Sequence, residues 1–457
     1  MKDSIDFGSM NISTLFRKLL IPTVLGMVFS ALFVITDGIF VGKGIGSDAL
    51  AAVNITAPLF MIAAGIGLMF GVGASVVASI HLSQGKRKVA SINITQAIAF
   101  SALLILILSA LCLYFIEPLA RLLGSSDRLL PLAVEYMAWY IPFLVFYEVL
   151  NIGMFCIRLD GSPTYTMMCN AVAAILNIIL DYIFIFELGW GIMGAAFATS
   201  LGTVVGGLMT LIYLLRFSRT LHLCRIKLSI KSLLLTLRNI GYMIKLGSSA
   251  FISEASIACM MFLGNYVFIR HLGEDGVAAF SIACYFFPII FMVYNAIAQS
   301  AQPIISYNFG AGQYDRVKKA IRFLSVSTIA FTTFCWILIS IFPETFIHIF
   351  NRDETLVQAA IPAVRVYFFG FFMMSLQYSG QACFIGLGKA KQATFFSIFR
   401  KVIIVLPLTL LFPRLGGLGA MGVFLAEPVS NFIGGAACYG TMLRTVWQEL
   451  NKKKESA

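Results

Sequence analysis

Charged residues are scarce in this chain. Of its 457 residues, only 12% are Asp, Glu, Lys or Arg, whereas 59% are hydrophobic. A soluble domain carries about a quarter charged residues, and a body of this size could not cover its surface with so few. The composition therefore excludes a soluble enzyme and a soluble nucleic-acid binder, although a net charge of +12 would suit the latter.

Signatures of catalysis and of cofactor binding are also missing. The four histidines lie in loops or at the ends of apolar runs, and the sequence contains no H-E-x-x-H, nucleophile elbow or P-loop. The nine cysteines form no C-x-x-C pair, and eight of them lie in apolar stretches, which is typical of packing residues. We therefore predict a protein that is not an enzyme and has no cofactor.

Long apolar runs are what the chain has in abundance. Twelve runs are long enough to cross a bilayer as helices, since a span needs about 20 residues, and none alternates with period two. This pattern predicts an all-α integral membrane protein. The expected spans are about 14–41, 49–80, 93–115, 131–155, 165–187, 192–215, 246–270, 276–306, 323–345, 356–385, 394–412 and 416–442.

The distribution of Lys and Arg predicts the orientation. With the N-terminus inside, 24 basic residues fall in cytoplasmic segments and 6 in segments on the opposite side. Loops rich in Lys and Arg stay in the cytoplasm, so both termini are expected to be cytoplasmic.

The two halves of the chain repeat each other at a nearly constant offset. Gly85 matches Gly312, Gly191 matches Gly419, and Leu-Asp-Gly at 159–161 matches Gly-Leu-Gly at 386–388. A repeat of six spans keeps its orientation, which predicts two parallel six-helix bundles, the architecture of an alternating-access transporter.

The predicted domains follow from this repeat. We expect a first bundle at 1–220 and a second bundle at 246–457, ending in a short cytoplasmic tail. The intervening segment, 221–245, is basic, and its later part alternates basic and apolar residues with helical spacing. This linker is expected to lie on the inner membrane surface.

Polar groups inside spans are costly and are therefore functional candidates. Asp37 lies in the first span, and Asn177 and Asp181 lie one helical turn apart in the fifth. Tyr136 and Thr199 can join them. Such an oxygen-rich cluster can bind Na⁺ through Asp37, Asn177 and Asp181, or share one proton between two acids. The alternative is that the acids only line a wet cleft.

The second half does not copy this cluster, since Gly264 and Leu408 stand at the positions of Asp37 and Asp181. It carries its own buried groups, which we predict to bind substrate. The predicted substrate-binding residues are Glu254, Arg400, Glu427, Met260 and Met261. The methionines would form an adaptable apolar wall, and the alternative for Glu254 is an ion pair with Arg400.

Two further residues of the first half have predicted roles. Pro22 lies fifteen residues before Asp37 in the first span, where a proline kinks a helix and could act as a hinge. Glu148 lies in the fourth span, close to its inner end, and its carboxylate is expected to snorkel to the inner membrane surface; the alternative is a functional acid inside the membrane.

Taken together, these features resemble the multidrug and toxic compound extrusion (MATE) family. The resemblance covers about residues 14–445. It rests on the six-plus-six repeat, TDGIFVGKGIGSDALAAV from residue 36, the Asn177-x-x-x-Asp181 pair, GWGIMGAAFAT at 189–199 and ISYNFGAGQYDRVKKA at 305–320.

The resemblance implies an antiporter that exports organic cations and drugs in exchange for Na⁺ or H⁺. It implies a cation site at the five residues of the first-half cluster and an acidic substrate residue at Glu254. Related bacterial proteins often carry Asp where this chain has Asn431, so Glu427 is the remaining acid there. A monomer in a bacterial inner membrane, with small molecules and lipid as partners and no nucleic acid, is expected.

Two other functions are alternatives. A lipid-linked oligosaccharide flippase has the same broad fold, but an anionic pyrophosphate favours several basic residues in the cleft, and the spans hold mainly Arg365, Arg400 and Lys401. A membrane-embedded enzyme is disfavoured by the missing catalytic motifs.

Overall fold

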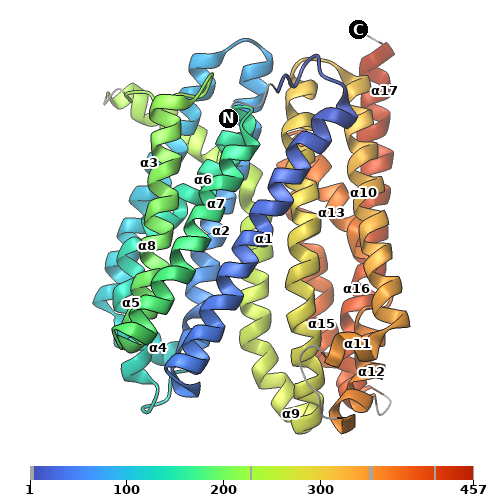
Figure 1. The fold of residues 1–457 in the computed structure, drawn as a ribbon. Helices are drawn as coiled ribbons and strands as arrows, with labels where there is room; N and C mark the ends of the chain where they lie inside the picture. Colours follow the sequence, from blue (N-terminus) through green and yellow to red (C-terminus); the bar gives the residue numbers. More distant parts are fainter. Residues whose placement is uncertain (1–4, 227–228, 349–353, 416–417, 456–457) are drawn as a thin grey trace. The chain divides into compact units, whose positions relative to one another are not determined.

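The computed structural model describes residues 5–226, 229–348, 354–415 and 418–455; the side chains of 258, 260–289, 354–356, 359, 420 and 454 are outside that description. The described residues form helices and no strand (Figure 1). Nine of the described helical stretches are long and apolar enough to cross a membrane. Two of the other predicted spans fall within α9 (Ile230–Gly310), and the last one overlaps α16 (Gly419–Met442) from Gly419 on. The predicted all-α fold class is confirmed.

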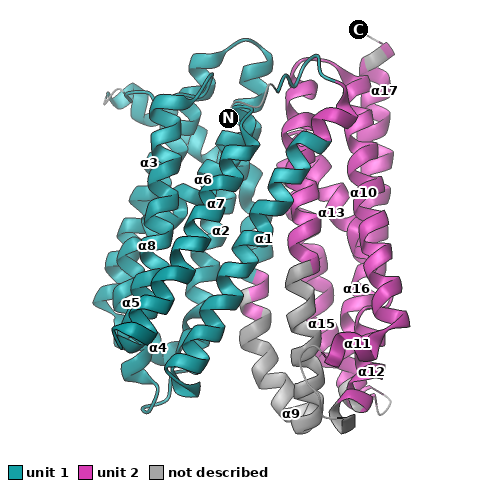
Figure 2. Cartoon of the chain, viewed as in Figure 1, with its two compact units in different colours: residues 1–10, 17–255 teal, residues 11–16, 256–457 magenta. Residues whose placement is uncertain are grey.

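The chain divides into two compact units (Figure 2). Unit 1 comprises Met1–Met10 and Arg17–Ala255, and unit 2 comprises Asn11–Phe16 and Ser256–Ala457. The predicted linker, 221–245, and the first ten residues of the predicted second bundle thus belong with unit 1.

Unit 1 is a helical bundle that includes the start of α9. Its other helices are α1 (Ile12–Gly44) from Arg17 on, α2 (Ser47–Ser83), α3 (Arg87–Tyr114), α4 (Ile116–Leu122), α5 (Leu130–Tyr140), α6 (Leu144–Leu159), α7 (Pro163–Asp181) and α8 (Gly191–Ile212). Helix α2 packs on α3 and α6, and α8 packs on α6 and α7.

Close packing of α9 on α2 explains why the predicted linker belongs with unit 1. A Cβ atom on Gly73 of α2 would collide with the backbone of Met243, and one on Gly247 of α9 would collide with the backbone of Met69. Small residues allow such close approach of helices in membranes.

Unit 2 repeats the helix order of unit 1. Its helices after α9 are α10 (Tyr314–Ile341), α11 (Pro343–His348), α12 (Glu354–Tyr367), α13 (Phe371–Gly386), α14 (Ala390–Ile398), α15 (Leu406–Leu411), α16 and α17 (Gln448–Glu455). Helices α10, α11, α13 and α14 begin at the repeat positions of the first residues of α3, α4, α6 and α7. The packing of α13 on α10 and α16 matches that of α6 on α3 and α8.

Turn geometry is repeated as well. Gly85 has φ 74° and its counterpart Gly312 has φ 71°, while Gly161 has φ 87° and Gly388 has φ 71°. Other residues rarely adopt these left-handed angles. The sequence repeat therefore reflects duplicated backbone bends.

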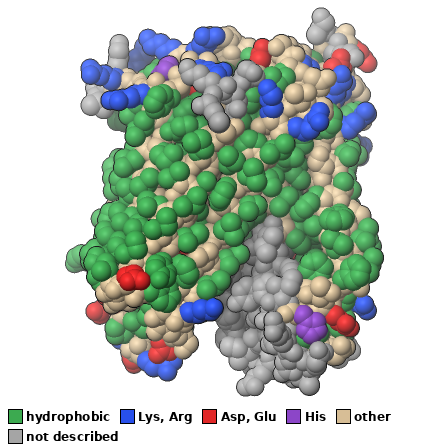
Figure 3. Space-filling view, viewed as in Figure 1, with side chains coloured by type: hydrophobic (Ala, Val, Ile, Leu, Met, Phe, Trp, Pro, Cys, Tyr) green, Lys and Arg blue, Asp and Glu red, His purple; other side chains and the backbone are tan. Residues whose placement is uncertain are grey.

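Hydrophobic side chains cover the flanks of the helices in unit 1, and Lys and Arg lie near the helix ends (Figure 3). Ile21, Leu103 and Leu111 are among the exposed apolar residues. Such a surface is stable in contact with lipid, as expected for membrane-spanning helices.

Asp160 is the centre of a hydrogen-bond network after α6. Its carboxylate accepts bonds from the Tyr213 hydroxyl (2.8 Å) and from the backbone N–H groups of Arg219 (2.7 Å), Thr220 (2.8 Å) and Leu221 (3.1 Å). The Thr220 hydroxyl donates a further bond of 2.7 Å. Asp160 thereby fixes the loop that follows α8.

We expect Asp160→Ala to destabilise the protein by about 2–4 kcal/mol, because bonds to a charged acceptor are strong and several partly buried backbone donors would lose their acceptor. Thermal unfolding of the purified protein measures the loss. The control is Asp127→Ala, which removes an ion pair with Arg121 whose Asp side chain is 88% exposed, a pair worth less than about 1 kcal/mol. Equal melting temperatures for the two variants would contradict the assignment.

Candidate functional site

Four helices of unit 1 bring the predicted cation-binding residues together. Asn177 on α7 donates from Nδ2 to Thr199 Oγ1 on α8 (3.3 Å), and Thr199 donates in turn to Asp37 Oδ1 on α1 (3.2 Å). Tyr136 on α5 lies within hydrogen-bonding reach of Thr199. Together with Asp181, these residues form what we call the polar cluster.

Asp181 completes the polar cluster at the end of α7. Its carboxyl lies within hydrogen-bonding reach of the Asp37 carboxyl. The backbone then continues as a π-helix, Tyr182–Glu187. Such wider turns are rare and often occur at functional sites. The sequence pattern of α7 gave no sign of this change.

The polar cluster is shielded from solvent. Asn177 and Asp181 are 0% exposed, and Asp37 is 8% exposed. Among the described residues, no donor meets Asn177 Oδ1 or either carboxylate oxygen of Asp181 with hydrogen-bond geometry. Three buried oxygen atoms are thus free to accept a proton or to coordinate a cation.

The charges of the polar cluster also favour binding of a proton or a cation. Two buried carboxyl groups cannot both remain charged side by side without compensation. Within the described parts of the chain, no Lys, Arg or His forms an ion pair with Asp37 or Asp181. A bound proton or a small cation would supply the compensating charge, and carboxylate, amide and hydroxyl oxygens suit a hard cation such as Na⁺.

Tyr140 also belongs near this site, although we did not predict it. Its ring centroid lies 6.0 Å from that of Tyr136, and its buried hydroxyl has no hydrogen-bond partner among the described residues. Its position one turn after Tyr136 was the available signal, since residues four apart share a helix face.

Arg400, predicted to bind substrate, lies inside unit 2. It is 1% exposed and belongs to a π-helix, Phe399–Val405. Its Nη1 donates to Glu427 Oε1 (3.1 Å) and to the Asn431 side chain, both on α16. Its stem lies against Gly434, where an added Cβ would lie 2.8 Å from Arg400 Cγ. The structure thus brings two predicted substrate residues together as a buried ion pair.

Glu254 lies in unit 1, on the part of α9 that faces α2. A Cβ on Gly65 would lie 3.2 Å from Glu254 Cβ, and the Glu254 carboxylate acts electrostatically on Tyr147 of α6. The side chains of Met260 and Met261 lie outside the described residues, so their predicted role stays a prediction.

The expectation that Glu148 snorkels is wrong. Its side chain is 0% exposed, and neither carboxylate oxygen has a hydrogen-bond partner among the described residues. Glu148 lies eleven residues before the end of α6, roughly 16 Å at helical rise, which is too far for its short side chain. The Glu148 side chain instead packs against Gly67 of α2, where an added Cβ would lie 2.9 Å from Glu148 Oε2.

Pro22 lies inside α1, which runs unbroken from Ile12 to Gly44 and carries Asp37. Proline lacks the N–H that would bond one turn back. The neighbouring hydroxyl of Thr23 donates to the carbonyl of Leu19 (2.7 Å). The hinge role of Pro22 stays a prediction.

Comparison with known protein families finds a match to this chain. The family model described as MatE matches residues 22–183 and again 249–411. The two matched stretches begin and end at equivalent positions of the two halves, which agrees with the repeat seen in the sequence.

Individual relatives match nearly the whole chain. An FAD transporter of Shewanella oneidensis is 27% identical over 447 residues, covering 96% of each chain. The multidrug export protein MepA of Staphylococcus haemolyticus is 24% identical and covers 92% of each. A crystal structure of a MATE transporter in a bent conformation superposes with a TM-score of 0.87 at 22% identity, covering 98% of this chain and 97% of the other.

The fold match agrees with the predicted twelve-helix membrane architecture, and the predicted absence of enzymatic activity agrees with a family of transporters. The duplicated match to the family model covers well over half of the residues. The chain belongs to the MATE family of efflux transporters.

Proposed function

We propose that this protein is a cation-coupled antiporter that exports cationic or amphipathic small molecules in exchange for Na⁺ or H⁺. One observation carries the proposal: Asp37 and Asp181 lie together in the interior of unit 1, with buried oxygens that no described donor satisfies. A group of this kind binds and releases a positive charge.

The proposed mechanism is alternating access. Binding of the ion at the polar cluster neutralises the two acids and favours the outward state that releases substrate, whereas substrate binding from inside favours the other state. Coupling exists because the two ligands prefer different states. Pro22, on the helix that carries Asp37, is the proposed hinge.

The substrate class follows from the sign of the buried charge. Among the described residues of unit 1, four acids are buried against the single buried base Arg158: Asp37, Glu148, Asp160 and Asp181. Arg400 in unit 2 is already paired with Glu427. An interior with a surplus of acids favours organic cations. The export protein MepA supports a role in multidrug efflux.

A flavin nucleotide is the second candidate substrate. The relative from Shewanella oneidensis is named an FAD transporter and covers 96% of the chain at 27% identity. An anionic dinucleotide would need a cationic contact, for which Arg400 Nη2, which has no hydrogen-bond partner among the described residues, is a buried candidate.

Everted membrane vesicles test both candidates. Vesicles loaded with Na⁺, or acidified inside, should accumulate a fluorescent cationic dye, and the gradient that works identifies the coupling ion. Flavin adenine dinucleotide offered to the same vesicles tests the second candidate. If neither gradient moves the dye, the antiport proposal fails; if only the flavin nucleotide accumulates, the second candidate replaces the first.

We also propose the cellular location and the oligomeric state of the protein. The bacterial relatives and the apolar helices favour a multi-pass protein of the cell inner membrane. A single chain contains both six-helix repeats, so we propose that the monomer is the transporting unit.

A further inference from the structure

A pocket of about 270 Å³ lies in unit 1, away from the polar cluster. It is bounded by three helices: the end of α2, the start of α3 and the start of α9. Its lining residues are Val77, His81, Asn93, Arg238, Asn239 and Tyr242. By the predicted topology, this end of unit 1 faces the inner membrane surface.

The polar wall of the pocket is held in place. Asn239 Nδ2 donates to Gln96 Oε1 (3.1 Å), and Gln96 Nε2 donates to Thr236 Oγ1 (2.8 Å), which ties α9 to α3. Asn93 is fixed by a bond from its Nδ2 to the Val89 carbonyl (2.9 Å). These hydrogen bonds hold the side chains around the pocket in place where α2, α3 and α9 meet.

Two buried polar atoms of the lining residues have no partner within the described chain. They are Asn93 Oδ1 and His81 Nδ1, and Asn93 is 2% exposed. A buried acceptor without a donor costs free energy. A ligand with a hydroxyl group would satisfy Asn93.

The charge of the pocket is positive. Arg238 is its one charged lining residue, and Lys86 is close enough to His81 to act on it electrostatically. No acid is found among the described residues that line the pocket. A guanidinium group favours phosphate because it can donate two parallel hydrogen bonds.

The start of α9 has three distinct faces. Ile240, Met243 and Leu246 are buried against unit 1, whereas Leu233, Leu234 and Leu237 are at least half exposed. Lys231, Arg238 and Lys245 recur every seven residues and therefore share a third face. A helix with exposed leucines beside a basic face is typical of the membrane interface.

We propose that this pocket binds an anionic phospholipid through its headgroup, with phosphatidylglycerol as the fitting class. Its phosphate meets Arg238, a glycerol hydroxyl donates to Asn93 Oδ1, and its acyl chains run along the exposed leucines of α9. The leucines favour a lipid over a free anion. Such a lipid fastens the start of α9 to α2 and α3.

The test uses the purified full-length chain in detergent. Its melting temperature is measured against increasing phosphatidylglycerol, phosphatidylcholine or inorganic phosphate. We expect phosphatidylglycerol to raise the melting temperature in a saturable manner, and the other two to have little effect. In Arg238→Gln, half-saturation should need about tenfold more phosphatidylglycerol, because one charge-assisted contact is lost. Arg238→Lys, which keeps the charge, should lie in between.

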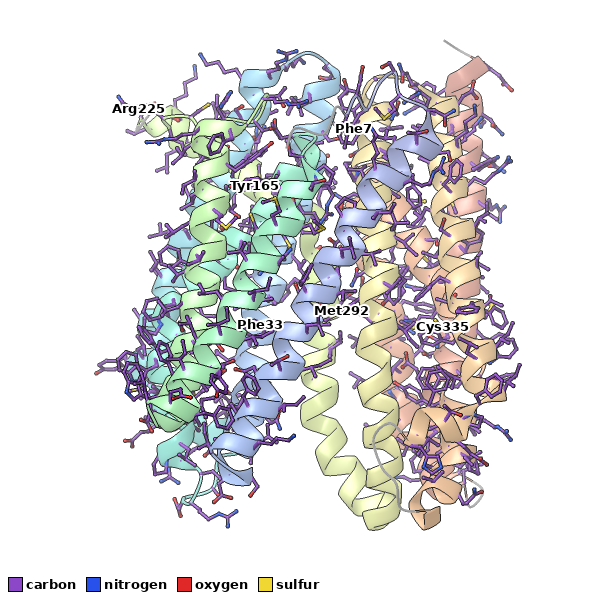
Figure 4. All side chains as sticks on the ribbon, viewed as in Figure 1. Phe7, Phe33, Tyr165, Arg225, Met292 and Cys335 are labelled. Atoms are coloured by element: carbon purple, nitrogen blue, oxygen red, sulfur yellow. The ribbon has the colours of Figure 1, made fainter. Side chains whose placement is uncertain are left out.

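Arg225→Gln is the matched control. Arg225 is exposed in the same basic segment, lies outside the pocket lining and projects from the end of unit 1 (Figure 4). It should titrate like the wild type. The proposal is overturned if Arg225→Gln and Arg238→Gln shift equally, if phosphatidylcholine stabilises as well as phosphatidylglycerol, or if inorganic phosphate alone gives the full effect.

Discussion

Asp37→Asn is expected to reduce gradient-driven export to near background. The amide keeps the shape of the carboxylate, and its oxygen can still accept the bond from Thr199 that Asp37 accepts at 3.2 Å. What it loses is the charge that attracts an ion. A bond to a charged group contributes about 1.5–3 kcal/mol, so ion affinity should fall by roughly 10- to 150-fold.

Everted vesicles give the measurement, with dye uptake followed at a fixed gradient. Asp48→Asn is the control, because Asp48 lies at the start of α2 in a partly exposed ion pair with Arg128 (3.0 Å). It should transport like the wild type. Equal melting temperatures for the wild type and Asp37→Asn would show that folding is intact.

Asp181→Asn tests whether Asp37 and Asp181 bind the same ion. If Asp37 and Asp181 serve one ion, the double variant should be about as impaired as either single variant, since residues that share a ligand are not additive. Full activity in Asp37→Asn, or losses that simply multiply in the double variant, would contradict a shared site.

Arg400→Met is expected to cost about 3–5 kcal/mol of stability, because removal of one partner leaves a buried charge uncompensated. The charge left behind is Glu427, whose Oε1 lies 3.1 Å from Arg400 Nη1. Glu427→Leu should be similarly unstable, since it leaves Arg400 buried in the same place. Thermal unfolding of the purified variants gives the measurement.

The double variant Arg400→Met/Glu427→Leu should recover much of the loss, because an apolar pair of similar volume can replace a buried ion pair. Lys453→Met is the control: its pair with Glu449 (2.9 Å) is partly exposed and should matter by less than about 1 kcal/mol. A double variant with full stability and lost substrate binding would assign the pair to the substrate site. Additive destabilisation would show that the two residues act independently.

The structure could be predicted from the sequence at positions where few residue types fit the backbone conformation. Gly85 and Gly312 occupy left-handed turns, so the duplicated bends could be predicted from glycines at matching positions of the two halves. That Asn177 and Asp181 lie on one helix face also followed from helical spacing alone. The approach of Thr199 to Asp37, which is far away in the chain, could be expected only because ionisable groups inside a membrane seek partners.

The features that could not be predicted from the sequence depend on how each helix is rotated about its axis and on where its winding changes. Glu148 and Arg400 lie in spans whose hydropathy does not say which residue faces the interior, and their burial follows from packing against Gly67 and Gly434. The π-helix after Asp181 has no sequence signature of its own. Each of these features is set by neighbouring helices that are distant in the chain.

The matched left-handed glycines have a consequence for the history of this chain. Gly161 and Gly388 still make the same bend, whereas Gly264 and Leu408 stand where the first half has Asp37 and Asp181. After duplication of one segment, a substitution at a bend would strain the copy that carries it, whereas the second half folds without the two acids of the first. The descendants of the ancestral half therefore diverged in chemistry while keeping a common skeleton.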